Sequence, residues 1–131
     1  MYRMAIYSKH DITTADITAT DKGGEDMNAQ AALTEAVYYI LLSLVTPRHG
    51  YGIMQEAERM SQGRVKLAAG TLYGAINGLL EKGWIRAVPG AEDSRRKEYV
   101  LTDKGREALT WELDRLKELV QNGEIVLGGA A

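Results

Sequence analysis

The sequence contains no cysteine. The chain therefore forms no disulfide, no thiolate zinc site and no cysteine nucleophile, as is typical of proteins from a reducing compartment. It also lacks any apolar run near the roughly 20 residues that a membrane span requires, and Met1 to Lys9 lack the sustained apolar stretch of a secretory signal. We therefore expect a cytoplasmic protein whose fold depends on side-chain packing.

Excess positive charge, which many nucleic-acid-binding proteins carry, is absent as well. The formal net charge is −2. The charges are unevenly distributed, because the first 26 residues contain more acidic than basic side chains. Local clustering decides which surface attracts a polyanion, so the net charge does not exclude a DNA-binding function.

The length of 131 residues suits one folded domain with additions at its ends. Residues 1–28 show no sustained helical period, and we expect them to form an N-terminal extension that is disordered or contains a short extra element. We assign residues 29–102 to the folded domain, 103–123 to a C-terminal helix and 124–131 to a tail.

The spacing of apolar residues predicts a mainly α-helical protein with a small β-hairpin. Apolar residues at helical spacing predict three helices, over 31–45, 51–61 and 71–82. Alternating residues predict strands over 64–67, 84–88 and 97–101, of which the last two form the hairpin. With a last helix that begins after the N-cap Thr102, this is the order of a winged helix-turn-helix with an added C-terminal helix.

In a helix-turn-helix the second helix of the pair enters the major groove, and here that helix is 71–82. With Leu72 on the core side, the helical period places a polar and glycine-rich set on the opposite face: Gly70, Gly74, Asn77 and Glu81, flanked by Thr71, Tyr73 and Gly78. The Asn77 amide suits an adenine edge, and the Thr71 and Tyr73 hydroxyls suit phosphates. Tyr73 is equally typical of a half-buried aromatic residue.

Gly74 and Gly78 each cost about 1 kcal/mol of helix stability relative to alanine. Close approach of another backbone would offset this cost. That approach can come from DNA or from a second protein helix.

The hairpin carries a basic cluster at its tip and on its return strand: Arg95, Arg96 and Lys97. Such side chains reach the phosphate backbone or the minor groove. We expect Arg64 and Lys66, on the strand before the recognition helix, to join the same face. Surface charge runs are often only solvated, and acidic neighbours partly offset this one.

Two helices carry more apolar surface than one small domain needs, which predicts a homodimer. The expected interface residues share a helical stripe or a coiled-coil spacing: Val37, Tyr38, Leu41, Leu109, Leu113, Leu116 and Val120. Trp111, together with Tyr38 and Tyr39, is a candidate effector site. The simpler interpretation makes these three aromatic residues part of the interface packing.

Three segments in order carry a family resemblance: HGYGI from His49, GTLYGAINGLLEKGWI from Gly70, and RRKEYVLTDKGREAL from Arg95. They resemble the PadR family of bacterial transcriptional repressors. The resemblance implies a homodimer that binds a near-palindromic operator and releases it when a small aromatic or hydrophobic effector binds. By position it implies a set of DNA contacts: Tyr51, Thr71, Tyr73, Arg95, Arg96 and Lys97.

The chain departs from this family at two places. Gly74 stands where many members have proline, and the C-terminal part is a single helix, as in short-form members. Two other function classes remain open. A protein-interaction module would dock a partner helix on Gly74 and Gly78. An enzyme has little support, because His10 and His49 lie far apart, and no nucleophile, metal-ligand or phosphate-loop motif accompanies them. We expect no catalytic residue, metal or cofactor, and a turn at His49.

Overall fold

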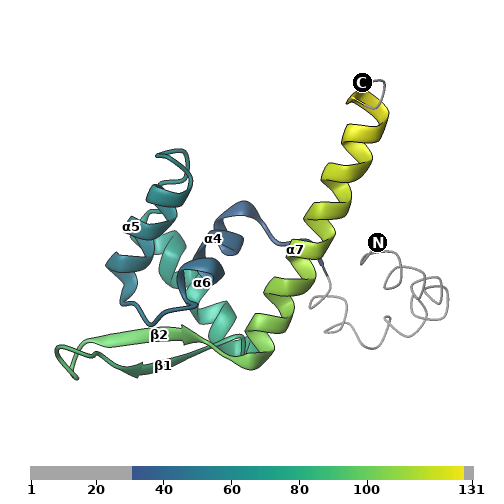
Figure 1. Ribbon diagram of the computed structural model, residues 1–131. Helices are drawn as coiled ribbons and strands as arrows, with labels where there is room; N and C mark the ends of the chain where they lie inside the picture. Colours follow the sequence, from purple (N-terminus) through teal and green to yellow (C-terminus); the bar gives the residue numbers. More distant parts are fainter. Residues whose placement is uncertain (1–30, 129–131) are drawn as a thin grey trace. The chain divides into compact units, whose positions relative to one another are not determined.

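The computed structural model describes residues 31–128, so the expected extension over 1–28 lies outside the described residues. The elements follow in the order α4 (Glu35–Ser43), α5 (Gly50–Met60), α6 (Ala69–Lys82), β1 (Ile85–Pro89), β2 (Lys97–Leu101), α7 (Asp103–Gly123) and η1 (Glu124–Gly128) (Figure 1). This order confirms the mainly helical winged helix-turn-helix fold. The chain divides into two compact units, one over Leu33–Leu109 and one that includes residues 110–128.

Helix α4 begins directly after Thr34, whose side-chain oxygen accepts a hydrogen bond from the backbone N–H of Val37 at 3.1 Å. Glu35 places a negative charge in the first turn, where the helix dipole favours it. The helix is shorter than the expected span of 31–45. The N-cap, and not the first apolar residue, sets where it begins.

Helices α5 and α6 lie within two residues of their expected bounds. His49 is the N-cap of α5, and its Nδ1 accepts a hydrogen bond from the Gly52 N–H at 3.2 Å. Helix α6 ends at Gly83, which has a φ of 75°. Glycine adopts this left-handed conformation without the steric cost of a Cβ, so Gly83 stops the helix as the sequence predicts.

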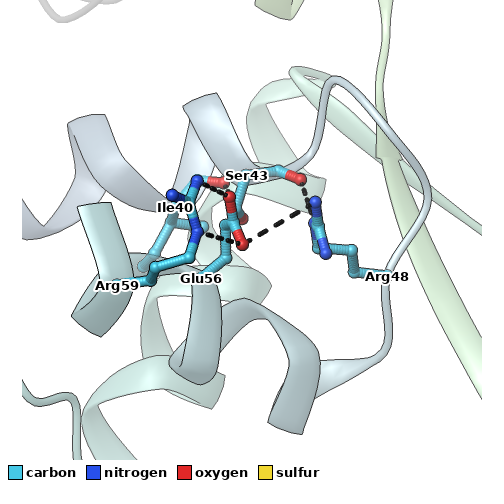
Figure 2. Close-up of polar contacts among 5 residues, drawn as sticks. All are labelled: Ile40, Ser43, Arg48, Glu56 and Arg59. Atoms are coloured by element: carbon cyan, nitrogen blue, oxygen red, sulfur yellow. Dashed lines mark hydrogen bonds and ion pairs between the residues drawn. The ribbon is translucent and has the colours of Figure 1, made fainter.

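Polar contacts join the end of α4 to α5 (Figure 2). The Arg48 Nε donates to the Ser43 carbonyl at 2.8 Å, and the Arg48 Nη2 lies 4.0 Å from the Glu56 Oε1. Glu56 also pairs with Arg59 at 2.5 Å, and the hydrogen bond from Arg59 lowers the pKa of Glu56 below its ordinary value. These contacts orient the loop between the first two helices of the domain.

Strands β1 and β2 form an antiparallel two-stranded sheet, in which Ile85 lies opposite Leu101 and Pro89 opposite Lys97. Figure 1 shows the turn between the strands projecting away from helices α4 to α6. The hairpin therefore lies where the sequence predicts it. In a winged helix this projecting hairpin is the wing.

The prediction of a strand over 64–67 is wrong, because these residues form no strand. Arg48 instead bridges Tyr99 of β2, with N···O distances of 3.1 and 2.9 Å. The alternation at 64–67 has a different cause: Leu67 enters the core while Arg64 and Lys66 face solvent. An irregular segment with alternating buried and exposed side chains thus has the same sequence pattern as a strand.

The core of the Leu33–Leu109 unit collects apolar side chains from all three helices and from the hairpin. Its buried members are Ile40, Leu41, Leu44, Ile53, Ala57, Leu67, Leu72, Ile76, Leu79, Trp84, Ile85 and Leu109. The junction to α7 is fixed by Thr102, whose hydroxyl donates to the Gly83 carbonyl at 2.6 Å and accepts from the Gly105 N–H at 3.0 Å. Thr102 is therefore the cap that the sequence predicts.

The second unit contains the rest of α7, followed by the π-helical segment η1. The segment over 124–128, expected to be part of a tail, continues helically beyond Gly123. Within the described part of the chain, every helix is too short or too polar to cross a membrane.

Candidate nucleic-acid interface

The face of α6 opposite its core stripe is exposed, as the helical period predicts. Leu72, Ile76 and Leu79 are buried. The exposed residues on the other side include Gly70, Thr71, Tyr73, Gly74, Asn77 and the acidic Glu81. A Cβ built at Gly70, Gly74 or Gly78 meets no atom within 4 Å. The packing of this chain therefore does not require these three glycines, and another molecule can approach the helix backbone closely.

The start of α6 has no side-chain cap, because its N-cap residue is Ala68. The first backbone N–H groups of a helix have no partner within the helix, and the helix dipole favours an anion at this end. Thr71 lies in this first turn and is exposed. The arrangement suits a phosphate group.

The start of α5 contributes a second polar edge. His49 caps the helix, as described above, and Tyr51 is 60% exposed. Tyr73 of α6 is 45% exposed, and a Cβ built at Gly50 would fall on its hydroxyl. The first turn of α5 and the Tyr73 hydroxyl are therefore immediate neighbours.

The basic side chains of the wing differ from one another in their partners. Arg95 makes two hydrogen bonds to the Asp93 carboxylate, at 3.1 and 3.2 Å. This side-chain hydrogen bond is the main cause that lowers the pKa of Asp93. Arg96 and Lys97 are exposed, and neither forms an ion pair with any residue of the described range 31–128. The wing thus presents two cations without an ion-pair partner in that range at its tip and return strand, and the charge of Arg96 also helps to lower the pKa of the nearby Asp93.

Arg64 and Lys66 are exposed but paired with carboxylates, and neither lies on a strand. The Arg64 Nη2 lies 2.5 Å from the Glu35 Oε2, and the Lys66 Nζ lies 3.9 Å from the Glu58 Oε2. The hydrogen bond from Arg64 lowers the pKa of Glu35 below its ordinary value. The two cations therefore have acidic partners within their own domain.

Two of the residues expected at a dimer interface belong to the core instead. Leu41 is 0% exposed and Leu109 is 8% exposed, so neither can bury further surface against a partner. The same spacing of apolar residues is expected for a helix face that packs on the domain core and for one that packs on a partner, so the sequence pattern does not distinguish the two. Val37 and Tyr38 are half-buried, and the rings of Tyr38 and Tyr39 make an edge contact with centroids 6.3 Å apart.

Residues 110–128 carry an exposed apolar series. Leu113 and Val120 of the expected seam are exposed, while Leu116 and Trp111 are half-buried. The series extends beyond the predicted interface residues, through Leu119, Ile125, Val126 and Leu127. The run IVL within the expected tail was the signal for this extension.

Three residues near the start of α5 have structural roles that sequence reasoning missed. His49 belongs to the turn before α5, as expected, but it also caps the helix. Arg48 pairs with Tyr99 of the wing, and Gly50 leaves room for Tyr73. The segment HGYGI marked this region as distinctive, but no local rule connects it to residues on α6 or β2.

Within residues 31–128, no group of three or more His, Asp or Glu side chains is placed to bind a metal ion. The exposed face of α6 offers hydroxyls, an amide and open backbone, and the wing offers cations. This combination suits hydrogen bonding and charge pairing with a polyanion.

The comparisons with known proteins agree on one class. A model of the transcriptional regulator PadR-like family matches residues 39–111. Among curated proteins, no sequence matches this chain significantly. A mutant of S. aureus MepR is 18% identical, with 92% of this chain and 82% of that chain covered and a TM-score of 0.61.

Two further solved structures show the same fold. H. salinarum RosR is 25% identical, with 72% of this chain and 96% of that chain covered and a TM-score of 0.51. Bordetella bronchiseptica BpsR, whose DNA binding is regulated by 6-hydroxynicotinic acid, is 17% identical. That comparison covers 69% of this chain and 60% of that chain, with a TM-score of 0.57.

Proposed function

Because this chain belongs to the PadR-like family of transcriptional regulators, we propose that it is a homodimeric, DNA-binding repressor that responds to a small effector. The observation that carries the proposal is that two wing cations without an ion-pair partner in the described residues, Arg96 and Lys97, lie in the same domain as the exposed face of α6. On that face no other described part of the chain packs against the glycine positions. The family consists of regulators, not enzymes.

Helix α6 enters the major groove in this proposal, and the wing follows the adjacent phosphates or minor groove. Asn77 contacts a base edge, and Thr71 and Tyr73 contact phosphates. The open backbone at Gly70 and Gly74 supports a close approach of the helix to DNA. Since the face offers one good base-contacting side chain, much of the specificity comes from half-site spacing and DNA shape.

The homodimer is supported by the exposed apolar side chains of α7 and η1, such as Leu113, Val120 and Leu127. Burying them against a second copy removes apolar surface from water. A two-fold dimer presents its two recognition helices about 34 Å apart, which is one turn of B-DNA. This geometry requires a near-palindromic operator. An operator on the chromosome also places the protein in the cytoplasm.

The effector is proposed to be a small aromatic or hydrophobic molecule. BpsR, a structural neighbour, has its DNA binding regulated by 6-hydroxynicotinic acid. Trp111, Tyr38 and Tyr39 are the aromatic residues that we assign to effector binding. The competing assignment makes them interface packing only, and substitution of Trp111 with an aliphatic residue separates the two: it abolishes induction in the first case and weakens the dimer in the second.

The test is a selection of genomic fragments bound by the full chain, followed by a titration of the selected fragment and of a shuffled version. We expect the selected fragment to bind more tightly, with an affinity that falls steeply between about 50 and 200 mM salt because each phosphate contact releases counterions. Repeating the selection with aromatic compounds tests induction. The control for non-specific charge effects is the shuffled fragment.

A protein-interaction module is the second candidate, and the open positions at Gly74 and Gly78 favour it because a partner helix can pack closely there. This candidate predicts no bound genomic fragment and a complex with another protein whose affinity changes little with salt. That result would overturn the DNA-binding proposal.

A further inference from the structure

Gly50, at the start of α5, is required by a neighbouring side chain and not by its own backbone. It is buried, and its φ is not among the positive values, which belong to Gln62, Gly63 and Gly83 in the described range 31–128. A Cβ built at Gly50 would overlap the Tyr73 hydroxyl and would lie 2.7 Å from the ring Cζ. Any residue larger than glycine therefore competes with Tyr73 for the same space.

The other glycines of the two helices make a useful contrast. A Cβ at Gly52, two residues further along α5, would make ordinary contacts of 3.6 Å with the side chains of Arg48 and His49. A Cβ at Gly74 or Gly78 would meet nothing within 4 Å. Of the glycines of helices α5 and α6, Gly50 alone faces a side chain that a Cβ would displace.

Tyr73 lies on α6 and is partly exposed, and its hydroxyl reaches the first turn of α5. Tyr51, the residue after Gly50, is exposed in the same turn. The lack of a Cβ at Gly50 thus brings the hydroxyl of one helix to the exposed start of the other.

We propose that Gly50 is a positioning residue for DNA binding: it seats the Tyr73 ring against the start of α5 and so fixes the Tyr73 hydroxyl for a phosphate contact. The inference rests on the proposed function. In the variant Gly50→Ala the helix persists, because alanine is the better helix former. The partly exposed Tyr73 ring must then rotate outward, and its hydroxyl leaves the first turn of α5.

The experiment compares Gly50→Ala with Gly52→Ala, a matched glycine-to-alanine change in the same helix, in the full chain. Fluorescence anisotropy measures the affinity for the selected genomic fragment at several salt concentrations. We expect Gly50→Ala to weaken binding about tenfold or more, as for loss of a hydrogen bond to a charged group. We expect Gly52→Ala to bind as the wild type does. The salt slope of Gly50→Ala stays unchanged, because tyrosine is uncharged.

A double-variant cycle assigns the effect to Tyr73. We expect Tyr73→Ala to weaken binding as much as Gly50→Ala, and the two together to weaken it no further. The melting temperature of Gly50→Ala stays at or above that of the wild type. A Gly50→Ala effect that persists in the Tyr73→Ala background, or a clear fall in its melting temperature, would overturn the inference.

A measurement without DNA keeps the inference separate from the proposed function. With tyrosine rings labelled for NMR, the Tyr73 ring signal shifts in Gly50→Ala and stays in place in Gly52→Ala. An unshifted signal in Gly50→Ala overturns the inference even if the wild type binds DNA. A wild type that binds no fragment overturns the proposed function, while the ring signal still decides whether Gly50 positions Tyr73.

Discussion

Two groups of basic side chains, both expected to contact DNA, differ in their neighbours. Arg64 and Lys66, in the connection between α5 and α6, face Glu35 and Glu58. Arg96 and Lys97 of the wing have no ion-pair partner within residues 31–128. Side chains of the same charge therefore differ in how much they can add to DNA affinity. A cation that already pairs with a carboxylate gains less interaction energy from a phosphate.

The energy of surface ion pairs shows how this difference acts. Such pairs contribute at most about 1 kcal/mol each, so a phosphate can displace Glu35 or Glu58. The displaced carboxylate nevertheless remains nearby and repels the phosphate. Arg95 is intermediate, since its partner Asp93 lies in the same turn of the wing. The paired cations therefore add less affinity than the unpaired ones.

The largest effect is expected when both unpaired wing cations are removed. The double variant Arg96→Ala/Lys97→Ala should weaken binding to the selected fragment by tenfold or more and lower the salt slope by about 2, one for each lost phosphate contact. The double variant Lys104→Ala/Arg106→Ala removes the same charge from the start of α7 and should change both quantities less. Equal losses in the two variants would contradict a specific role for the wing.

A smaller effect is expected at the α5–α6 connection. The variant Arg64→Ala/Lys66→Ala removes two charges as well, but both are paired with carboxylates in the free protein. Its salt slope, measured by the same titration, should fall by clearly less than that of the wing variant. If the two slopes fell equally, the ion pairs would not limit these cations.

Removing an acidic partner should act in the opposite direction. Glu35→Gln frees Arg64, so we expect a few-fold gain in affinity and a steeper salt slope. Glu107→Gln is the matched control, because it makes the same charge change on the exposed surface of α7. The gain should disappear when Arg64→Ala is combined with Glu35→Gln. Equal gains from Glu35→Gln and Glu107→Gln would show that only net charge matters.

The smallest effect concerns pH and stability. The Arg64 hydrogen bond lowers the pKa of Glu35 in the folded state. The pair therefore stabilises the fold at neutral pH, above the pKa of Glu35 in the unfolded chain, and this contribution is lost as the pH falls through the lowered value. The melting temperature of the wild type should exceed that of Glu35→Gln slightly at neutral pH, and the difference should vanish in acid. A difference that grows in acid would contradict this assignment.

The local elements of the fold could be predicted because their signals are local. Thr102 and Gly83 are a cap and a stop at the expected positions, and α5 and α6 lie within two residues of theirs. The strand over 64–67 failed because alternating burial and strand pairing produce the same pattern. The two cases differ only in whether the segment has a strand to pair with. The residue that bridges Tyr99 of β2 is Arg48, not a residue of 64–67.

The sequence predicted which residues of the candidate site are exposed, but not which residues of other elements they contact. The helical period places Asn77 and Gly74 on the exposed face of α6, and the structure agrees. No period reveals that Leu41 is enclosed by the core or that Gly50 touches Tyr73. These facts depend on residues far apart in the sequence.

The sequence by itself determined the helices and the β-hairpin, the exposed face of α6 and the basic tip of the wing, because periodicity, caps and turns act over a few residues. Tertiary structure alone decided which cations are free, since Glu35 pairs with Arg64 across 29 positions of the chain. It also decided that Gly50 lies directly against the Tyr73 hydroxyl. Both depend on the distance between side chains from different elements, which packing sets and local sequence does not record.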